Sequence, residues 1–156
     1  GVGPLSPHFF SMDGTIPRRR LPDVLERMAL MSDAYGLKVA NVFHAGDGNL
    51  HPLILYDANK GELDRAEAFG NDILRLCVEV GGVLTGEHGV GIEKRDLMPE
   101  MFSETDLKHQ QRVKCAFDPA LLLNPGKVFP VLHRCAELGR MHVHHGELPF
   151  PDLPRF

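Results

Sequence analysis

The sequence lacks the cysteine pairs, long apolar runs and basic stripes that mark several classes of protein. Its three cysteines, Cys77, Cys115 and Cys135, include no Cys-x-x-Cys pair, so a zinc ribbon is not indicated. No apolar run approaches the roughly 18 residues needed to cross a bilayer, and we expect no membrane span. With a net charge of −4 and no basic stripe, the chain gives no reason to expect nucleic-acid binding.

The composition is that of one folded domain. The chain has 156 residues, of which 43% are hydrophobic and 24% are charged, a balance typical of a globular protein with a buried core. It opens on Gly1-Val2-Gly3-Pro4 without a start methionine, and we therefore expect a segment of a longer chain. Its first residues do not have the pattern of a signal peptide, and we expect none within this sequence. We expect a cytoplasmic location, with any attachment at the periphery of the inner membrane made through a partner subunit.

The hydrophobic periodicity of residues 1–92 predicts alternating strands and helices. The two helical stretches show apolar residues at helical spacing, and each is followed by glycine. The predicted order is strand, helix, strand, strand, helix, strand, over residues 8–16, 23–35, 38–44, 50–56, 63–80 and 83–85. This order predicts an α+β fold, a ferredoxin-like split βαβ antiparallel sheet with helices on one face.

We divide the chain into three parts. Residues 1–92 form the predicted ferredoxin-like domain. The pattern turns helical again in residues 93–129, with helices expected near 93–101 and 104–116. Residues 130–156 are rich in proline and histidine, and we expect an irregular tail there.

Two histidines flank a predicted hairpin loop. His44 and His51 stand on either side of the string Ala-Gly-Asp-Gly-Asn-Leu. If the two strands pair so that these histidines face each other, their Cβ atoms lie about 4.5–5.5 Å apart on one face of the sheet. Two imidazoles at that separation can bind one metal ion at roughly 2.0–2.1 Å each. The alternative is that two polar residues end two strands and have no further role.

A glycine-rich corner follows the last predicted strand and reads Thr85-Gly-Glu-His-Gly-Val-Gly91. Its glycines place Glu87 and His88 on a tight turn. A carboxylate beside two imidazoles completes a His-His-Glu set with open positions, which is typical of catalytic rather than structural metal sites. His88 is then available as a general base near neutral pH. The glycine spacing fits neither a Rossmann fingerprint nor a phosphate loop, and a turn with two exposed polar residues is the alternative.

A third segment contains Phe117-Asp-Pro and, after it, Leu123-Asn-Pro-Gly-Lys127. By itself it is explained by a helix exit followed by a turn, because Asn-Pro-Gly is common in turns.

Together these three segments resemble the C-terminal region of the FAD-linked oxidases of the vanillyl-alcohol-oxidase type. This family includes D-lactate dehydrogenases, D-2-hydroxyglutarate dehydrogenases and bacterial glycolate oxidases. The matching segments, residues 44–51, 82–91 and 117–127, have the order and spacing of the family. Within it, residues 12–18 and 132–151 are most similar to the FAD-linked (D) subunits of bacterial glycolate oxidases.

The resemblance implies a role for each candidate residue. His44, His51 and Glu87 would bind a divalent metal, zinc or else manganese or iron, and His88 would be the catalytic base. It further implies that FAD is held mainly by an upstream domain that this chain lacks. The segment 93–129 would return toward that domain.

Two residues of the returning segment, Asn124 and Lys127, are the candidate flavin contacts. The implied reaction is oxidation of a small 2-hydroxy acid, glycolate or D-lactate, to the 2-oxo acid, with an iron–sulfur subunit as electron acceptor. We expect the isolated chain to bind no FAD and to be inactive. On the residues alone, a metal-dependent hydrolase and a non-catalytic module with a structural metal also remain open.

Overall fold

The structure is a computed structural model that describes residues 2–130. The described residues divide into two compact units, residues 2–89 and residues 90–130. Beyond residue 130, the predicted irregular tail lies outside the described residues. Within the described part of the chain, no helix has both the length and the apolar character required to span a membrane.

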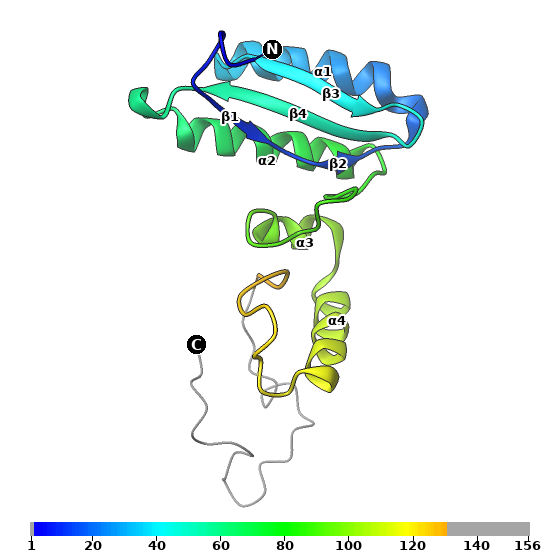
Figure 1. Ribbon diagram of the computed structural model, residues 1–156. Coiled ribbons are helices and arrows are strands. Elements are labelled where there is room, and N and C mark those ends of the chain that lie inside the picture. Colours follow the sequence, from blue (N-terminus) through cyan, green and yellow to red (C-terminus); the bar gives the residue numbers. More distant parts are fainter. Residues whose placement is uncertain (1, 131–156) are drawn as a thin grey trace, which may run out of the picture. The chain divides into compact units, whose positions relative to one another are not determined.

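The first unit is built on an antiparallel sheet whose central strand is β4 (Asn49–Tyr56), as Figure 1 shows. One edge of β4 pairs with β3 (Val39–His44), and the other pairs with β1 (His8–Ser11) and β2 (Gly14–Thr15). The predicted strand over residues 8–16 is therefore present but interrupted.

The interruption between β1 and β2 lies opposite Pro52. Ser11 pairs with Leu53 and Gly14 with Leu50, so β1 and β2 follow β4 in one register. Met12 donates its N–H to the Pro52 carbonyl at 3.3 Å, but proline has no N–H to return. The missing hydrogen bond accounts for the break in an otherwise regular edge.

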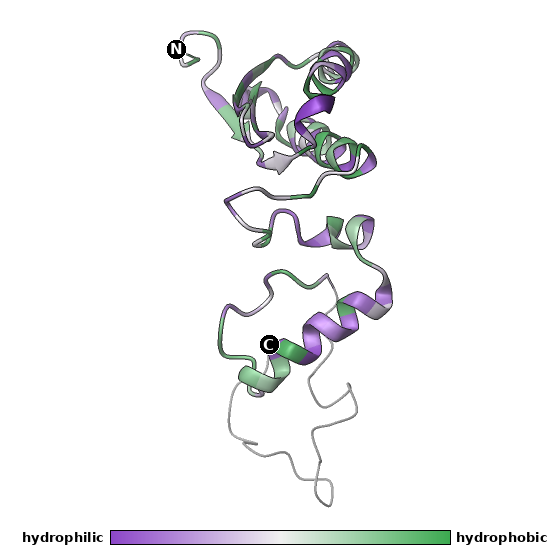
Figure 2. Ribbon diagram, turned by 90° about the vertical axis from the view of Figure 1, so that its right-hand side faces the viewer, coloured by the Kyte–Doolittle hydropathy of each residue, from purple (hydrophilic) through white to green (hydrophobic). Residues whose placement is uncertain are grey.

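Two helices, α1 (Leu21–Tyr35) and α2 (Leu63–Glu79), cover one face of this sheet, as the turned view of Figure 2 makes clear. Both helices were predicted, and α1 ends at Gly36, whose φ of 63° suits glycine. The core between the helices and the sheet consists of apolar side chains at helical and alternating spacing: Ile16, Val24, Met28, Leu37, Leu50, Ile54, Ala66, Phe69, Ile73, Leu76 and Cys77.

The predicted strand over residues 83–85 is wrong. Only Val83 pairs, in an isolated bridge with Thr15. The N–H groups that follow, of residues 86–88, are donated to the side chain of Asp13 rather than to a neighbouring strand. The structure therefore confirms the α+β class, with a small antiparallel sheet and helices on one face, but the sixth element of a split βαβ fold is a turn.

In the second unit the described helices are η3 (Arg95–Leu97), α3 (Met98–Met101) and α4 (Glu104–Phe117). The predicted helix over 93–101 is thus a 3₁₀ turn followed by one helical turn, whereas the predicted helix over 104–116 is confirmed. Ser103 begins α4 with a capping box, in which its hydroxyl accepts from the Asp106 N–H and the Asp106 carboxylate accepts from the Ser103 N–H.

Asp118 fixes the chain where α4 ends. Its buried carboxylate accepts the N–H groups of Leu122 at 2.9 Å and Leu123 at 3.0 Å, and it accepts from Lys114 Nζ at 2.8 Å. Burial alone would raise the pKa of Asp118, but the Lys114 ammonium and the two N–H groups outweigh it and lower the pKa.

The lowered pKa of Asp118 predicts an acid-sensitive second unit. Because the folded-state pKa lies below the unfolded value of about 3.9, the stabilisation is present above that pH and is lost as pH falls through the folded-state pKa. At pH 7 we expect Asp118→Asn to unfold at a lower urea concentration than the wild type, and the difference to shrink below about pH 4. The amide signals of α4 report this unfolding, and a difference independent of pH would contradict the prediction.

Candidate functional site

The predicted metal-binding histidines share the face of the sheet that α1 and α2 leave uncovered. In the register of β3 and β4, His44 pairs with Asn49 and His51 pairs with Val42. The condition that the histidines face each other directly is therefore not met, because the turn over residues 45–48 closes the hairpin at the pair of His44 and Asn49. They are diagonal neighbours, which still point to one face because side chains two residues apart in a strand do so. Their ring centroids lie 5.3 Å apart.

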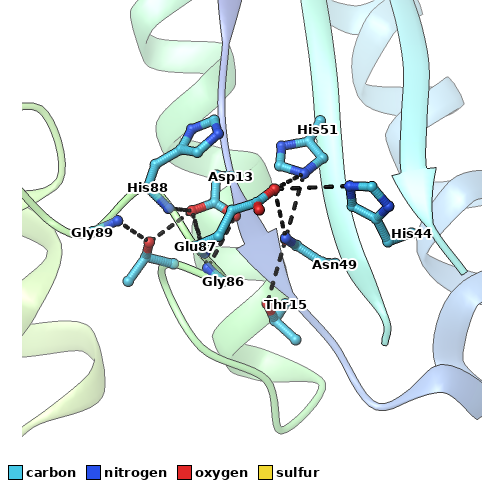
Figure 3. Close-up of polar contacts among 10 residues, drawn as sticks. Asp13, Thr15, His44, Asn49, His51, Gly86, Glu87, His88 and Gly89 are labelled. Atoms are coloured by element: carbon cyan, nitrogen blue, oxygen red, sulfur yellow. Dashed lines mark hydrogen bonds and ion pairs between the residues drawn. The ribbon is translucent and has the colours of Figure 1, made fainter. Parts of the chain in front are cut away.

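The glycine-rich corner brings Glu87 to both histidines, as Figure 3 shows. Glu87 Oε1 lies 2.6 Å from His51 Nε2 and 3.8 Å from His44 Nε2. One ligand atom from each of the three residues can be chosen so that all lie within 4.8 Å of one another. The side chain of His51 is only 12% exposed, whereas those of His44 and Glu87 are 61% and 52% exposed. The site is therefore open to solvent on one side.

The donor set of His44, His51 and Glu87 fits a divalent metal. Two ligand atoms that bind one ion at roughly 2.0–2.2 Å in tetrahedral geometry lie about 3.3 Å apart. The two separations from Glu87 Oε1, 2.6 Å and 3.8 Å, fall on either side of this value. The partial exposure of the His44 and Glu87 side chains gives them room for the small changes in separation that binding one ion requires. Three ligands leave at least one coordination position open, as catalytic sites do.

His88 lies next to the cluster without belonging to it. Its ring centroid is 5.1 Å from that of His51, and the two ring planes are inclined by 33°. The backbone N–H of His88 is donated to Asp13 at 2.8 Å, so the residue is held by its main chain while its imidazole remains exposed. The His88 imidazole thus lies beside that of His51 and outside the group of His44, His51 and Glu87.

Asn49 is a site residue that the sequence analysis did not assign. It is 7% exposed and stands opposite His44 on the same face. Its Nδ2 donates to Glu87 Oε1 at 3.3 Å and lies 3.4 Å from His51 Nε2. Its Oδ1 accepts from the Thr15 hydroxyl at 3.5 Å. The signal in the sequence was its position at the start of a strand, two residues before His51.

Asp13 is the second residue that the sequence analysis missed. Its carboxylate is fully buried and accepts the Thr85 hydroxyl at 2.7 Å and the N–H groups of Gly86, Glu87 and His88. Burial alone would raise the pKa of Asp13, but these four donors outweigh it and hold the pKa well below its usual range. An aspartate inside a predicted strand was the only hint of this role.

The candidate flavin contacts, Asn124 and Lys127, lie in the second unit, in the turns that follow α4. Asn124 has a φ of 47°, in the left-handed region that asparagine tolerates better than most residues. The carbonyl of Gly126 accepts from Arg95 Nη1 at 3.0 Å, which ties this segment to η3. Their role toward FAD stays a prediction.

Comparison with known proteins gives consistent results. Residues 2–128 match the family described as FAD linked oxidases, C-terminal domain. The chain is 62% identical over 156 residues to the glycolate oxidase subunit GlcD of Escherichia coli (strain K12), covering 99% of this chain and 31% of that protein. It is 36% identical over 126 residues to the glycolate oxidase subunit GlcD of Bacillus subtilis (strain 168), covering 80% of this chain and 27% of that protein.

A further relative is named as a D-lactate dehydrogenase rather than as a glycolate oxidase subunit. The chain is 35% identical over 124 residues to the mitochondrial D-lactate dehydrogenase (cytochrome) of Kluyveromyces lactis, covering 80% of this chain and 21% of that protein. The chain thus spans less than a third of the length of each of these three relatives.

Proposed function

The chain belongs to the FAD-linked oxidases through their C-terminal domain, and from this membership we propose that it supplies the acid–base and metal-binding part of a flavin-dependent 2-hydroxy-acid dehydrogenase. The observation that carries the proposal is the convergence of His44, His51 and Glu87 beside His88 on one open face. Relatives named as glycolate oxidase subunits and as D-lactate dehydrogenases support glycolate or D-lactate as the substrate. No observation favours a hydrolase.

We assign the divalent metal to His44, His51 and Glu87. When bound, such an ion supplies Lewis acidity, which lowers the pKa of a hydroxyl group that it contacts. Two imidazole nitrogens and one carboxylate oxygen suit zinc, manganese and iron alike. Glu87 contributes the negative charge of the set, and Asn49 Nδ2 holds its Oε1 by a hydrogen bond.

His88 is the proposed general base. Its exposed imidazole can accept the proton of the substrate hydroxyl, and a neutral imidazole is the usual acceptor near neutral pH. Its backbone N–H is anchored on Asp13, so that the ring is presented beside His51. Oxidation of the substrate to the 2-oxo acid also removes a hydride from its carbon, and FAD, when bound, would accept these two electrons.

The flavin and the electron acceptor belong to other parts of the proposed enzyme. FAD supplies the redox chemistry when bound, and the protein supplies orientation. Asn124 and Lys127 are the proposed contacts of this chain with FAD. Since relatives are named as subunits, we also propose that the whole protein works in an assembly, with an iron–sulfur subunit as the acceptor.

The test of this function is flavin reduction in the full-length protein that carries this chain. Mixed anaerobically with glycolate or with D-lactate, it is expected to lose its flavin absorbance at about 450 nm. The isolated 156-residue chain is expected to show no such band after incubation with FAD. An oxidised flavin that neither acid reduces would contradict the proposed reaction. A flavin band in the isolated chain would contradict the proposal that FAD is held mainly by another domain.

A further inference from the structure

The glycine-rich corner is a turn of the anion-binding kind, and the anion that it binds is a carboxylate side chain of the same protein. The N–H groups of three consecutive residues, Gly86, Glu87 and His88, point at the Asp13 carboxylate, as Figure 3 shows. The distances to Asp13 Oδ2 are 3.0, 3.1 and 2.8 Å. Successive N–H groups in such a turn form a concavity that elsewhere binds phosphate or another free anion. Here Asp13 fills the concavity.

Asp13 connects this corner to the part of the chain that runs alongside β4, the strand that carries His51. It lies between β1 and β2, which keep one register along β4, with Ser11 opposite Leu53 and Gly14 opposite Leu50. By that register, Asp13 stands at the level of His51. One buried carboxylate therefore joins the turn that presents Glu87 to the sheet that presents its partner histidine.

The corner is also packed too tightly to shift without consequence. A Cβ atom on Gly86 would lie 2.4 Å from Asn49 Oδ1 and 2.5 Å from Thr15 Oγ1. The backbone at this position thus lies against the two side chains that pack beside the ligands. A displaced turn would move Glu87 Oε1 away from both His51 Nε2 and Asn49 Nδ2.

We propose that Asp13 is a positioning residue of the metal site, a role that rests on the proposed function of the His44, His51 and Glu87 cluster. Asp13 is fully buried and is not one of the three proposed metal ligands. It holds the backbone of residues 86–88 so that the Glu87 carboxylate meets His51 and the His88 imidazole lies beside it. Charge-assisted hydrogen bonds of this kind are about twice as strong as neutral ones, which suits a group that must fix a glycine-rich turn.

The test compares metal affinity among variants of the 156-residue chain, measured for Zn²⁺ and Mn²⁺ by competition with a chromophoric chelator. Asp13→Asn keeps the size of the side chain but replaces one acceptor oxygen by a donor. We expect it to bind metal about 10- to 100-fold more weakly, the usual cost of removing a residue that orients a ligand. Thr85→Val removes the hydroxyl that donates to Asp13, and it is expected to weaken metal binding less than Asp13→Asn does. Thr85→Ser keeps a hydroxyl and is expected to bind metal with wild-type affinity.

Asp118→Asn is the matched control, because it removes another buried carboxylate that accepts backbone N–H groups, but in the second unit. It should leave metal affinity unchanged. Wild-type affinity in a folded Asp13→Asn chain would overturn the proposal, as would equal losses in the Asp13 and Asp118 variants. If Asp13→Asn does not fold, Thr85→Val and Thr85→Ser are compared instead, and equal metal affinity in these two variants would overturn the proposal.

A second readout separates this proposal from the proposed function. Hydrogen exchange of the amides of residues 86–88 is expected to be faster in Asp13→Asn than in the wild type, and unchanged in Asp118→Asn. If the wild type binds no metal, the metal assignment fails. Hydrogen exchange then still tests whether Asp13 holds the backbone of residues 86–88. Unchanged exchange at these three amides in Asp13→Asn would overturn the positioning role whether or not the metal binds.

Discussion

Replacement of His88 by asparagine in the full-length protein is expected to lower the rate of flavin reduction by about 10²- to 10⁴-fold, the usual contribution of a general base. The reason is that no side chain would then accept the hydroxyl proton of the substrate beside the metal-binding cluster. Asparagine retains the backbone N–H that is donated to Asp13, so the turn and the metal affinity should survive. Stopped-flow absorbance measures the rate, and metal analysis measures the bound ion.

The control for this variant is His109→Asn, which alters an exposed histidine on α4. It should leave the rate of flavin reduction unchanged. The assignment of His88 as the base would fail if His88→Asn reduced the flavin at the wild-type rate. It would also fail if the slow variant had lost its metal, because the lost rate would then have another cause.

Replacement of His51 or Glu87 by alanine is expected to abolish metal binding and, in the full-length protein, flavin reduction. Three protein ligands hold the proposed ion, and the remaining two would hold it far less tightly. His51 is the ligand with the least exposed side chain and lies nearest to Glu87, so its loss removes the centre of the set. Metal analysis of the purified chain after dialysis should find about one ion in the wild type and none in either variant.

His8→Ala serves as the control, because His8 is another histidine at an edge of the same sheet, stacked on Tyr56. Its metal content should equal that of the wild type. Full metal content in His51→Ala would contradict the ligand assignment. Equal loss in all three variants would show that the bound metal does not depend on this cluster.

Local features of the sequence were enough to predict most of the secondary structure of the first unit. The periodicity of residues 23–35 and 63–80 predicted α1 and α2, because one apolar stripe per helix must be buried whatever the rest of the chain does. The strands β3 and β4 followed from alternation, and glycine predicted the end of α1. The short helix after residue 93 was less predictable, since its first turn is 3₁₀.

By itself, the sequence determined which residue types are available for chemistry and that the two histidines lie on either side of a hairpin loop. Side-chain identity and strand alternation are local properties. Only the tertiary structure decided that His44 and His51 are diagonal, that residues 83–85 do not continue the sheet, and that Asn49 and Asp13 support the Glu87 turn. The first outcome follows from the exact length of the hairpin turn, whereas the others depend on which donor finds which acceptor across more than 30 residues of chain. Such competition among distant partners leaves no periodic trace in the sequence.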